Sequence, residues 1–314
     1  PRARGPGLRF AGVTMAVQPL VTVVIPSYRR PDQLASCLRS VVRSDFPPDR
    51  FEVLVVDDGN EEPLDARVNW SAGAVGVRWV RLPENLGPAA ARNAGARAAR
   101  GARLAFIDDD CLADRTWLAR LYASSAANDG AAVGGRVVGG SGDNLFCAAD
   151  QAILDVVFAY YNEDPLQARF LSAASLLVPA DAFRESGGFD PAFCTAEDRE
   201  FCARWLAGGR RLVYAADAVA VHAATSSFGR FWRRHFAFGE GAYRFRSRHA
   251  RAPDGRIALE PPGFYRRLVS APKKRPMRAR EAAIAALIVV SQLASALGFL
   301  AARRAAHTSK GRTA

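Results

Sequence analysis

The stretch LAFIDDD at residues 104–110 sets three carboxylates directly after an apolar run. The apolar part is typical of the end of a buried strand. Three like charges at this spacing repel one another, and holding them away from water is costly unless a cation or a network of donors compensates. A divalent cation with oxygen ligands, Mg²⁺ or Mn²⁺, would supply that compensation. On these residues alone, an acidic turn or a helix N-cap is an equally good interpretation.

Residues 21–26 (VTVVIP) and 51–56 (FEVLVV) read as two more buried strands. Between them, Pro31 suits the first turn of a helix, and apolar residues recur behind it at helical spacing. A strand, a helix and a strand in this order imply a right-handed parallel unit. The second strand leads into Asp57 and Asp58, and open α/β sheets bind ligands at the carboxyl ends of their strands.

The pattern continues with a strand over 77–82 and an Ala/Arg-rich helix over 89–100, which leads into the strand that ends at Ile107. No GxGxxG follows the first strand, so a dinucleotide-binding oxidoreductase is disfavoured. The chain also has no GxxxxGKS or GxxxxGKT motif, which excludes a P-loop nucleotidase. A nucleotide site in this chain would therefore use carboxylates and a metal in place of a glycine-rich cradle.

The composition allows one large domain or two small ones with a substantial core, because 49% of the 314 residues are hydrophobic; the net charge is +12. The five cysteines are odd in number and form no CxxC pair. This favours small reduced core residues of a cytoplasmic chain over a disulfide framework or a zinc site. Residues 1–19 are predicted to be a disordered extension rich in Arg, Gly and Pro, with Pro1 or Met15 as the start, and they lack the apolar region of a secretory signal.

The motifs together resemble those of a known family. VTVVIPSYRR, VLVVDDGN, NLGPAAARNAG and FIDDD occur in this order, followed by SGGFD at residues 186–190 and AED at residues 196–198. The series resembles family 2 glycosyltransferases, which are inverting, nucleotide-sugar-dependent enzymes with the GT-A fold. The resemblance covers Val21 to His222, about two thirds of the chain.

The resemblance implies an α/β architecture with a Rossmann-like, mostly parallel sheet and helices on both of its faces. The catalytic domain is expected over residues 20–227, with a nucleotide-binding half at 20–110 and an acceptor half at 111–227.

A nucleotide-sugar site is implied at the ends of the first two strands. The residues that match it are Pro26, Ser27, Tyr28, Asp57 and Asp58. Carboxylates suit this role because they accept hydrogen bonds from a base imide or a ribose hydroxyl. Two aspartates before Gly59 also suit a tight turn. Arg92 matches a position that contacts the nucleotide, and a solvated helix face is the alternative for it.

The aspartate cluster matches the family's DxD motif, and the implied cofactor is Mn²⁺ or Mg²⁺. Asp110 would be the main metal ligand, with Asp108 as a second ligand on the ribose side and Asp109 assisting in nucleotide-sugar binding. His222 follows an apolar run where many relatives carry a histidine that completes the metal shell. A histidine that is only hydrogen-bonded is an equally good interpretation.

The pair Glu197-Asp198 matches the family's ED motif, whose aspartate is the catalytic base. Asp198 would take the proton from the acceptor hydroxyl on the far side of the anomeric carbon from the leaving diphosphate. Glu197 would orient the acceptor or the metal shell. The alternative is an acidic pair that only favours a helix N-terminus.

Basic and aromatic residues are interleaved over 228–280, a region predicted to be helical. The pattern suits an anionic bilayer, a nucleic acid, or an acceptor subsite in which Arg binds a lipid diphosphate. A membrane surface is favoured and no nucleic acid is expected, because residues 281–304 then form a hydrophobic helix, a candidate membrane segment. A buried or amphipathic helix, or an interface with another copy, is nearly as well supported there. Residues 305–314 are predicted to be a disordered tail.

The sequence therefore predicts a metal-dependent inverting glycosyltransferase at the inner, cytoplasmic face of the plasma membrane, since the heavier basic load precedes the hydrophobic helix. The donor would be a UDP-, GDP- or dTDP-sugar. The acceptor would be a hydroxyl of a polysaccharide, a glycolipid or a polyprenyl-linked precursor of a cell-envelope glycan. Single addition is favoured, because the QxxRW motif of processive relatives is absent. The enzyme alternative is a transferase of the same fold that acts on a soluble small molecule or a protein. The alternative from another class is a catalytically silent membrane- or polyanion-binding module of the same fold.

Overall fold

The computed structural model describes residues 18–69, 73–140, 144–222, 227–249, 260–270 and 279–310. Most of the extension predicted over residues 1–19 therefore lies outside the described residues, as do residues 250–259 and 271–278 of the basic aromatic region.

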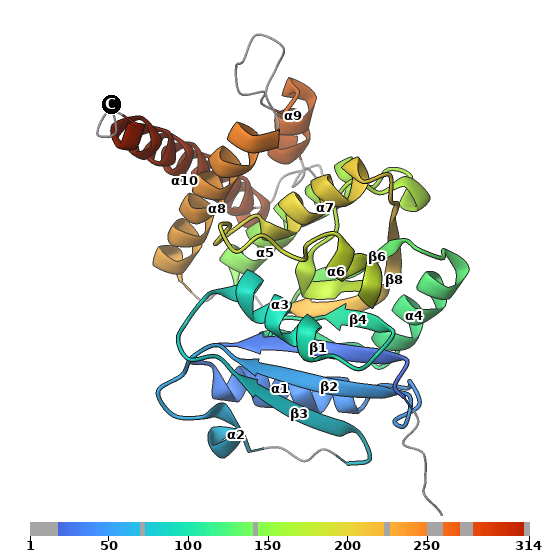
Figure 1. Ribbon diagram of the computed structural model, residues 1–314. Helices are drawn as coiled ribbons and strands as arrows, with labels where there is room; N and C mark the ends of the chain where they lie inside the picture. Colours follow the sequence, from blue (N-terminus) through green and yellow to red (C-terminus); the bar gives the residue numbers. More distant parts are fainter. Residues whose placement is uncertain are drawn as a thin grey trace, which may run out of the picture.

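One mixed sheet organises the molecule (Figure 1). Its strands are β1 (Val21–Ser27), β2 (Phe51–Asp57), β3 (Gly76–Arg81), β4 (Arg103–Phe106), β5 (Cys111–Ala113), β6 (Ala132–Gly139), β7 (Leu176–Pro179) and β8 (Leu212–His222). They lie in the order β3-β2-β1-β4-β7-β6-β8-β5. The neighbours from β3 to β4 are all parallel, as are β6 and β8, whereas β7 runs antiparallel to β4 and β6, and β5 to β8. The predicted mostly parallel sheet is confirmed, and its antiparallel pairs are those made by β7 and β5.

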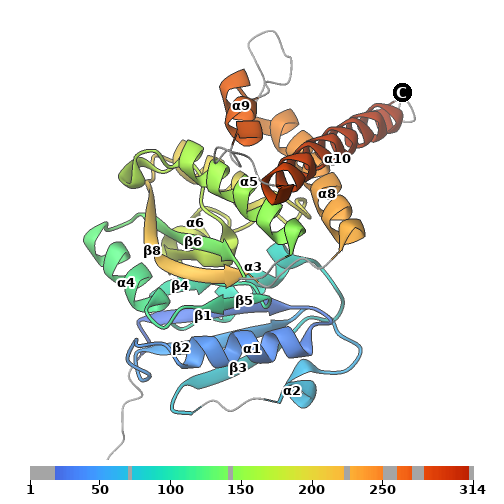
Figure 2. The same ribbon diagram turned by 180° about the vertical axis from the view of Figure 1, so that it is seen from behind.

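Helices cover both faces of the sheet, as predicted (Figures 1 and 2). They are α1 (Pro31–Val42), α2 (Leu64–Arg67), α3 (Pro88–Ala98), α4 (Trp117–Ala127), α5 (Leu145–Tyr161), α6 (Ala180–Glu185), α7 (Glu197–Ala207), α8 (Phe228–His249), α9 (Pro262–Ser270) and α10 (Ala279–Lys310). Side chains alternate between the faces of a strand. Val23 of β1 accordingly packs into the core shared with α1 and α4, and Val24 packs into the core shared with α3, α6 and α7.

The centre of the sheet is a topological switch point. The chain leaves β1 for β2 and β3 on one side, and returns to β4 on the other side of β1. The loops after β1 and β4 therefore diverge at the carboxyl ends of these strands, which is where such sheets bind ligands. Ser27 and the three aspartates after β4 lie at this edge.

The C-terminal helices form a separate body with α5, on the far side of the second half of the sheet (Figure 2). Phe231, Phe264, Leu268 and Ile288 make its core. The helices α8 and α10 cross closely because each offers a glycine at the crossing. A Cβ on Gly239 of α8 would collide with the backbone of Ser295. The helices α8, α9 and α10 thus pack on α5, which itself belongs to the catalytic domain predicted over 20–227.

Two expectations need correction. Helix α10 begins at Ala279 and continues to Lys310, so a disordered tail from residue 305 was wrong up to residue 310. Ala305 and Ala306 are strong helix formers, and they extend the hydrophobic helix past its basic end. The cysteines are free, as predicted, but Cys194 is exposed and only the other four are buried core residues.

Candidate active site

The three aspartates after β4 differ in their environment. Asp109 is buried, with 5% of its surface exposed, and accepts hydrogen bonds from Ser27 Oγ at 2.7 Å and from Arg30 at 3.1 Å. Arg30 also pairs with Asp110 at 2.8 Å. Burial raises the pKa of Asp109 to about 6, although Ser27 and Arg30 oppose the shift. The crowding of like charge inferred from the sequence is thus present, and one arginine offsets part of it.

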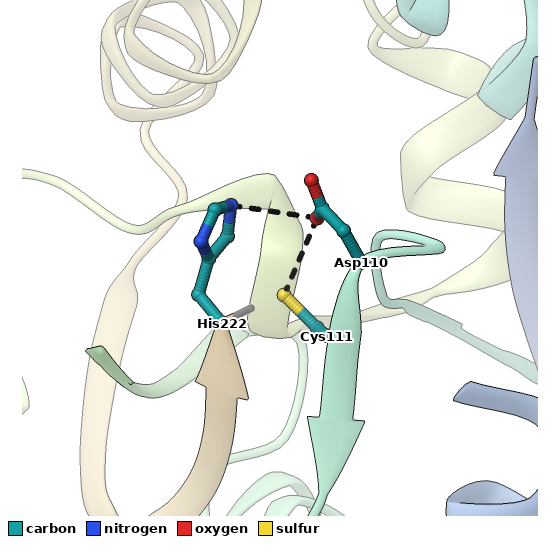
Figure 3. Close-up of side chains that lie close together, drawn as sticks. All are labelled: Asp110, Cys111 and His222. Carbon is teal, nitrogen blue, oxygen red and sulfur yellow. Dashed lines mark hydrogen bonds and ion pairs between the residues drawn. The ribbon is translucent and has the colours of Figure 1, made fainter. Parts of the chain in front are cut away.

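Asp110 meets His222 through strand pairing (Figure 3). Cys111 of β5 is in register with His222 of β8, so Asp110 Oδ1 lies 3.4 Å from His222 Nε2. Among the described residues, Asp110, Cys111 and His222 form a group whose potential ligand atoms lie within 4.8 Å of one another. The predicted third ligand, Asp108, is not in this group. A carboxylate and an imidazole fit a divalent cation such as Mn²⁺. Burial and the three neighbouring aspartates raise the pKa of the Cys111 thiol well above its usual value.

The acidic pair begins helix α7. Ala196, the residue before it, has a left-handed backbone with φ of 66°, which is strained for a residue with a side chain. Asp198 accepts a hydrogen bond from the backbone N–H of Arg199 at 2.8 Å. Burial and the neighbouring Glu197 carboxylate raise the pKa of Asp198 to about 7. A carboxyl group with this pKa can exchange a proton near neutral pH.

Arg92 of α3 connects the two acidic motifs. Its guanidinium is 3% exposed and donates to Asp108 at 2.5 Å and to Glu197 at 2.9 Å. It also lies over the ring of Phe189, 5.5 Å from the ring centroid. Burial lowers the pKa of Arg92, but the two carboxylates outweigh this effect and the net pKa is raised. A permanently charged group therefore holds the end of β4 and the start of α7 together.

Comparison with known proteins identifies the family. The model of the family described as "Glycosyl transferase family 2" matches residues 22–186, more than half of the chain. The chain belongs to glycosyltransferase family 2. The glycosyltransferase thus has the family that its sequence motifs predicted, and the matched segment contains β1 to β7 and all three aspartates.

Two curated relatives of this glycosyltransferase illustrate the similarity. Glycosyltransferase AglE of Haloferax volcanii is 27% identical over 229 residues, which are 71% of this chain and 73% of the relative. The pre-mycofactocin glycosyltransferase of Mycobacterium tuberculosis is 31% identical over 207 residues, which are 64% of this chain and 42% of the relative. The chain thus spans less than half of the second relative.

Solved structures support the GT-A fold of this glycosyltransferase. The mannosyltransferase PcManGT from Pyrobaculum calidifontis, solved in complex with GDP-Man and Mn²⁺, superimposes with a TM-score of 0.65. The match covers 90% of this chain and 87% of that one at 17% identity. Residues 1–349 of S. aureus TarS, solved with UDP-GlcNAc, give a TM-score of 0.53 at 16% identity, over 92% of each chain.

The residues predicted to bind the nucleotide at the ends of β1 and β2 lie at the carboxyl edge of the sheet, but two of them already have protein partners. Asp57 accepts from the backbone N–H groups of Asn60 and Leu64, and Asp58 accepts from those of Leu86 and Gly87. Burial raises the pKa of Asp58, although these two N–H groups oppose the shift. Both aspartates therefore shape the loops at this edge, and their contact with a nucleotide stays a prediction.

The loop that holds Asp57 and Asp58 also needs its glycine. Gly59 has φ of +75°, and a Cβ there would collide with the backbone of Glu84 and Asn85. Pro26 and Ser27 are buried and Tyr28 is half-buried beside them. The loops at the ends of β1 and β2 are thus closely packed against their neighbours.

Two residues of the site were not anticipated from the sequence. Arg30 and Cys111 touch the aspartate cluster, yet Arg30 reads as one of two arginines in a loop and Cys111 as a core residue. The repulsion of three adjacent carboxylates was the available signal, because it demands a nearby cation. Only the fold shows that this cation is Arg30, 79 residues away from Asp109 along the chain.

Proposed function

We propose that this chain is a metal-dependent, inverting glycosyltransferase that moves a sugar from a nucleotide-sugar to an acceptor hydroxyl. The observation that carries the proposal is the assembly of Asp108, Asp110, Glu197, Asp198 and His222 at one edge of the sheet. A nucleotide-sugar with UDP, GDP or dTDP as its nucleoside diphosphate is the proposed donor. The family membership and the GT-A fold support this choice.

In the proposed reaction, the acceptor oxygen forms a bond to the anomeric carbon on the face opposite the diphosphate. The bond from that carbon to the phosphate oxygen breaks, and its electron pair leaves with the nucleoside diphosphate. Asp198 takes the proton of the acceptor hydroxyl, which suits a carboxylate whose pKa is about 7. Arg92 holds Glu197 beside Asp198 and keeps Asp108 at the end of β4.

Asp110 and His222 are the proposed ligands of the divalent cation, with Asp108 close to the ribose. A cation bound there would act as a Lewis acid that offsets the charge of the departing diphosphate. The imidazole of His222 favours Mn²⁺ over Mg²⁺, because Mg²⁺ prefers oxygen ligands alone.

Metal binding can be tested without an acceptor. Titration of the full chain with Mn²⁺, followed by electron paramagnetic resonance of the free ion, should show one site. Both Asp110→Ala and His222→Ala should weaken this site at least about tenfold, since even outer-shell changes cost 10–100-fold. The same variants should lose the slow release of nucleoside diphosphate from the one accepted donor in a panel of UDP-, GDP- and dTDP-sugars.

Asp129→Ala, a change of an exposed aspartate in a turn, is the matched control and should keep both properties. A wild-type chain that neither binds Mn²⁺ nor releases nucleoside diphosphate would favour the catalytically silent binding module instead.

We further propose that α10 attaches the enzyme to the cytoplasmic face of a membrane, where a glycan, a glycolipid or a polyprenyl-linked precursor would be the acceptor. In the described part of the chain, α10 is the one helix long and apolar enough to cross a bilayer, and 28% of its apolar window is buried. Its exposed side chains include Val289, Leu293, Leu297 and Leu300. Arg280, Arg303 and Arg304 bracket this face and suit anionic headgroups.

The membrane proposal predicts that the chain sediments with vesicles that contain phosphatidylglycerol. Leu293→Glu should lower the partition coefficient at least about tenfold, because it removes a large apolar side chain from the contact. Leu166→Glu replaces an equally exposed leucine away from α10 and should have no effect. Equal sedimentation of the two variants would contradict the role of α10.

A further inference from the structure

A large cavity begins at the acidic motifs and extends into the C-terminal helices. Its volume is about 1040 Å³, at the upper end of the range of about 300–1,000 Å³ that is usual for small-molecule sites. Asp108, Glu197 and Asp198 line one part of it. The other part lies between α5, α8, α9 and α10, the four helices that pack together beside the second half of the sheet (Figure 2).

The cavity lies on the acceptor side of the catalytic aspartate. The five residues predicted to bind the donor at the ends of β1 and β2, from Pro26 to Asp58, are described and do not line it. Asp198, the proposed base, does line it, as do Arg92 and Asp108 of the predicted nucleotide-sugar site and His222 of the predicted metal site. Since the acceptor hydroxyl must approach Asp198 from the face opposite the diphosphate, the part of the cavity that leads from Asp198 away from Asp108 and into the C-terminal helices is placed for the acceptor.

The walls furnished by the helices are apolar. They include Ile153 and Val157 of α5, Phe238 of α8, Leu268 of α9 and Phe299 of α10. Burying such side chains against a hydrocarbon is favourable, whereas burying a sugar there would leave hydroxyl groups without partners. The chemistry of this part of the cavity therefore fits a hydrocarbon better than a second sugar ring.

The charged side chains in the same walls are paired with one another. Asp150 accepts from Arg234 at 3.0 Å and lies 2.9 Å from His235. Glu260 accepts from Arg199 at 2.5 Å and from Arg246 at 3.0 Å. Burial raises the pKa of Glu260, but Tyr161 and Arg199 outweigh it and hold the pKa below its usual value. Within each group the opposite charges offset one another, so a ligand in this part of the cavity would mainly contact apolar side chains.

Close packing between α8 and α10 fixes the positions of the cavity walls that these two helices provide. Gly239 of α8 lies against the backbone of Ser295, and Gly298 of α10 lies against the backbone of Phe236. Both Phe238 and Phe299, which line the cavity, are next to these glycines in the sequence. The distance between the two walls that α8 and α10 provide is thus fixed, because these two helices cannot move closer together.

We propose that this cavity holds the apolar portion of the acceptor, so that the acceptor is an amphipathic molecule with its reacting hydroxyl at Asp198. The inference rests on the proposed function and narrows its acceptor to one with a hydrocarbon part. A lipid-linked precursor and a compact apolar aglycone share this chemistry. The transfer itself is unchanged, since the hydroxyl proton goes to Asp198 and the nucleoside diphosphate leaves.

The test is calorimetric titration of the lipid-free full chain with butyl, octyl and cyclohexyl β-D-glucosides below their critical micelle concentrations. Each methylene that enters the cavity should tighten binding about fourfold, so octyl should bind up to about 200-fold more tightly than butyl. Tighter binding of octyl than of cyclohexyl glucoside indicates an acceptor with an extended alkyl chain, such as that of a lipid. Tighter binding of cyclohexyl glucoside indicates a compact aglycone. Equal affinity for butyl and octyl, with no gain for cyclohexyl, would overturn the proposal.

Substitutions of residues that line the cavity test whether the alkyl chain of the glucoside binds there. Ala296→Trp on α10, and the smaller change Ala242→Leu on α8, narrow the cavity and should reduce the gain from butyl to octyl at least about tenfold. Ala286→Trp places the same ring on the exposed side of α10, outside the cavity, and should leave that gain unchanged. If octyl glucoside still binds more tightly than butyl glucoside in both variants, the alkyl chain binds outside the cavity and the proposal is overturned.

Binding of the glucosides is measured without a donor, which separates this inference from the proposed function. Wild-type protein that releases nucleoside diphosphate but shows no preference among the glucosides refutes the cavity alone. Wild-type protein that binds octyl glucoside in the cavity but neither binds Mn²⁺ nor turns over any donor refutes the acceptor role together with the transferase.

Discussion

Asp198→Asn should lower kcat for sugar transfer about a thousandfold, the middle of the range that general-base catalysis supplies. The amide keeps the shape of the carboxyl group and its hydrogen bond from the Arg199 N–H, but it cannot take the proton of the acceptor hydroxyl. Binding of the nucleoside diphosphate and Mn²⁺ should be unchanged, because Asp198 is not among the proposed donor or metal contacts. The measurement is steady-state transfer to a saturating acceptor, with nucleotide binding followed separately.

The pH profile gives this prediction a second readout. Asp198 accepts a proton only when it is ionised, and burial with the nearby Glu197 raises its pKa to about 7. In the wild-type enzyme, kcat/KM should therefore fall about tenfold per pH unit below pH 7 and level off above it. The residual activity of Asp198→Asn should lack this dependence. A profile that is flat between pH 5 and 8 in the wild type would assign the base to another group.

Misfolding can be separated from loss of the base. A buried carboxyl group with a raised pKa is least stable when ionised, so the free energy of unfolding of Asp198→Asn at pH 8 should be equal to or higher than that of the wild type. Asp181→Asn changes an exposed aspartate of α6 and should leave transfer and stability within experimental error. If Asp198→Asn keeps more than a tenth of the wild-type kcat, Asp198 is not the base.

The fold was predictable from local patterns because the central strands are strongly biased in sequence. VTVVIP and FEVLVV are buried over their whole length in β1 and β2, as continuous β-branched and apolar runs suggest. The α3 and β4 boundaries fall within two residues of those predicted. The antiparallel strands β5 and β7 could not be derived in the same way, since three or four residues carry too little periodicity to show their partners.

The candidate site could be predicted from the sequence as a set of residues, and Asp110 and His222 were expected in one metal shell, but the strand pairing that brings them together was not predicted. The proximity of Asp110 to His222 depends on the register between β5 and β8, two strands far apart in the chain. Asp57 and Asp58 suited either a nucleotide contact or a tight turn in the sequence, and the fold engages both carboxylates with backbone N–H groups of neighbouring loops. Such partners arise from tertiary packing, which residue patterns along one segment do not encode.

Arg92 is the clearest case of a side chain whose partners only the tertiary fold shows. Its substitution is the second change for which we expect a large effect. Arg92→Met should lower the free energy of unfolding at pH 8 by about 3–5 kcal/mol, because it leaves two carboxylates near each other without their shared partner. It should also raise the pH midpoint of kcat/KM, since the positive charge of Arg92 opposes the rise in the pKa of Asp198. Urea unfolding measures the first effect and the pH profile of transfer measures the second.

Arg97→Met, on the exposed face of the same helix, is the matched control and should change stability by no more than about 0.5 kcal/mol. Arg92→Lys serves if Arg92→Met does not fold. An ammonium group can neutralise one carboxylate but lacks the planar fork that reaches both Asp108 and Glu197, so intermediate losses are expected. A normal pH midpoint in a folded Arg92 variant would show that the bridge only stabilises the fold. A raised midpoint would show that the same guanidinium ties the two acidic motifs together and sets the proton affinity of the base.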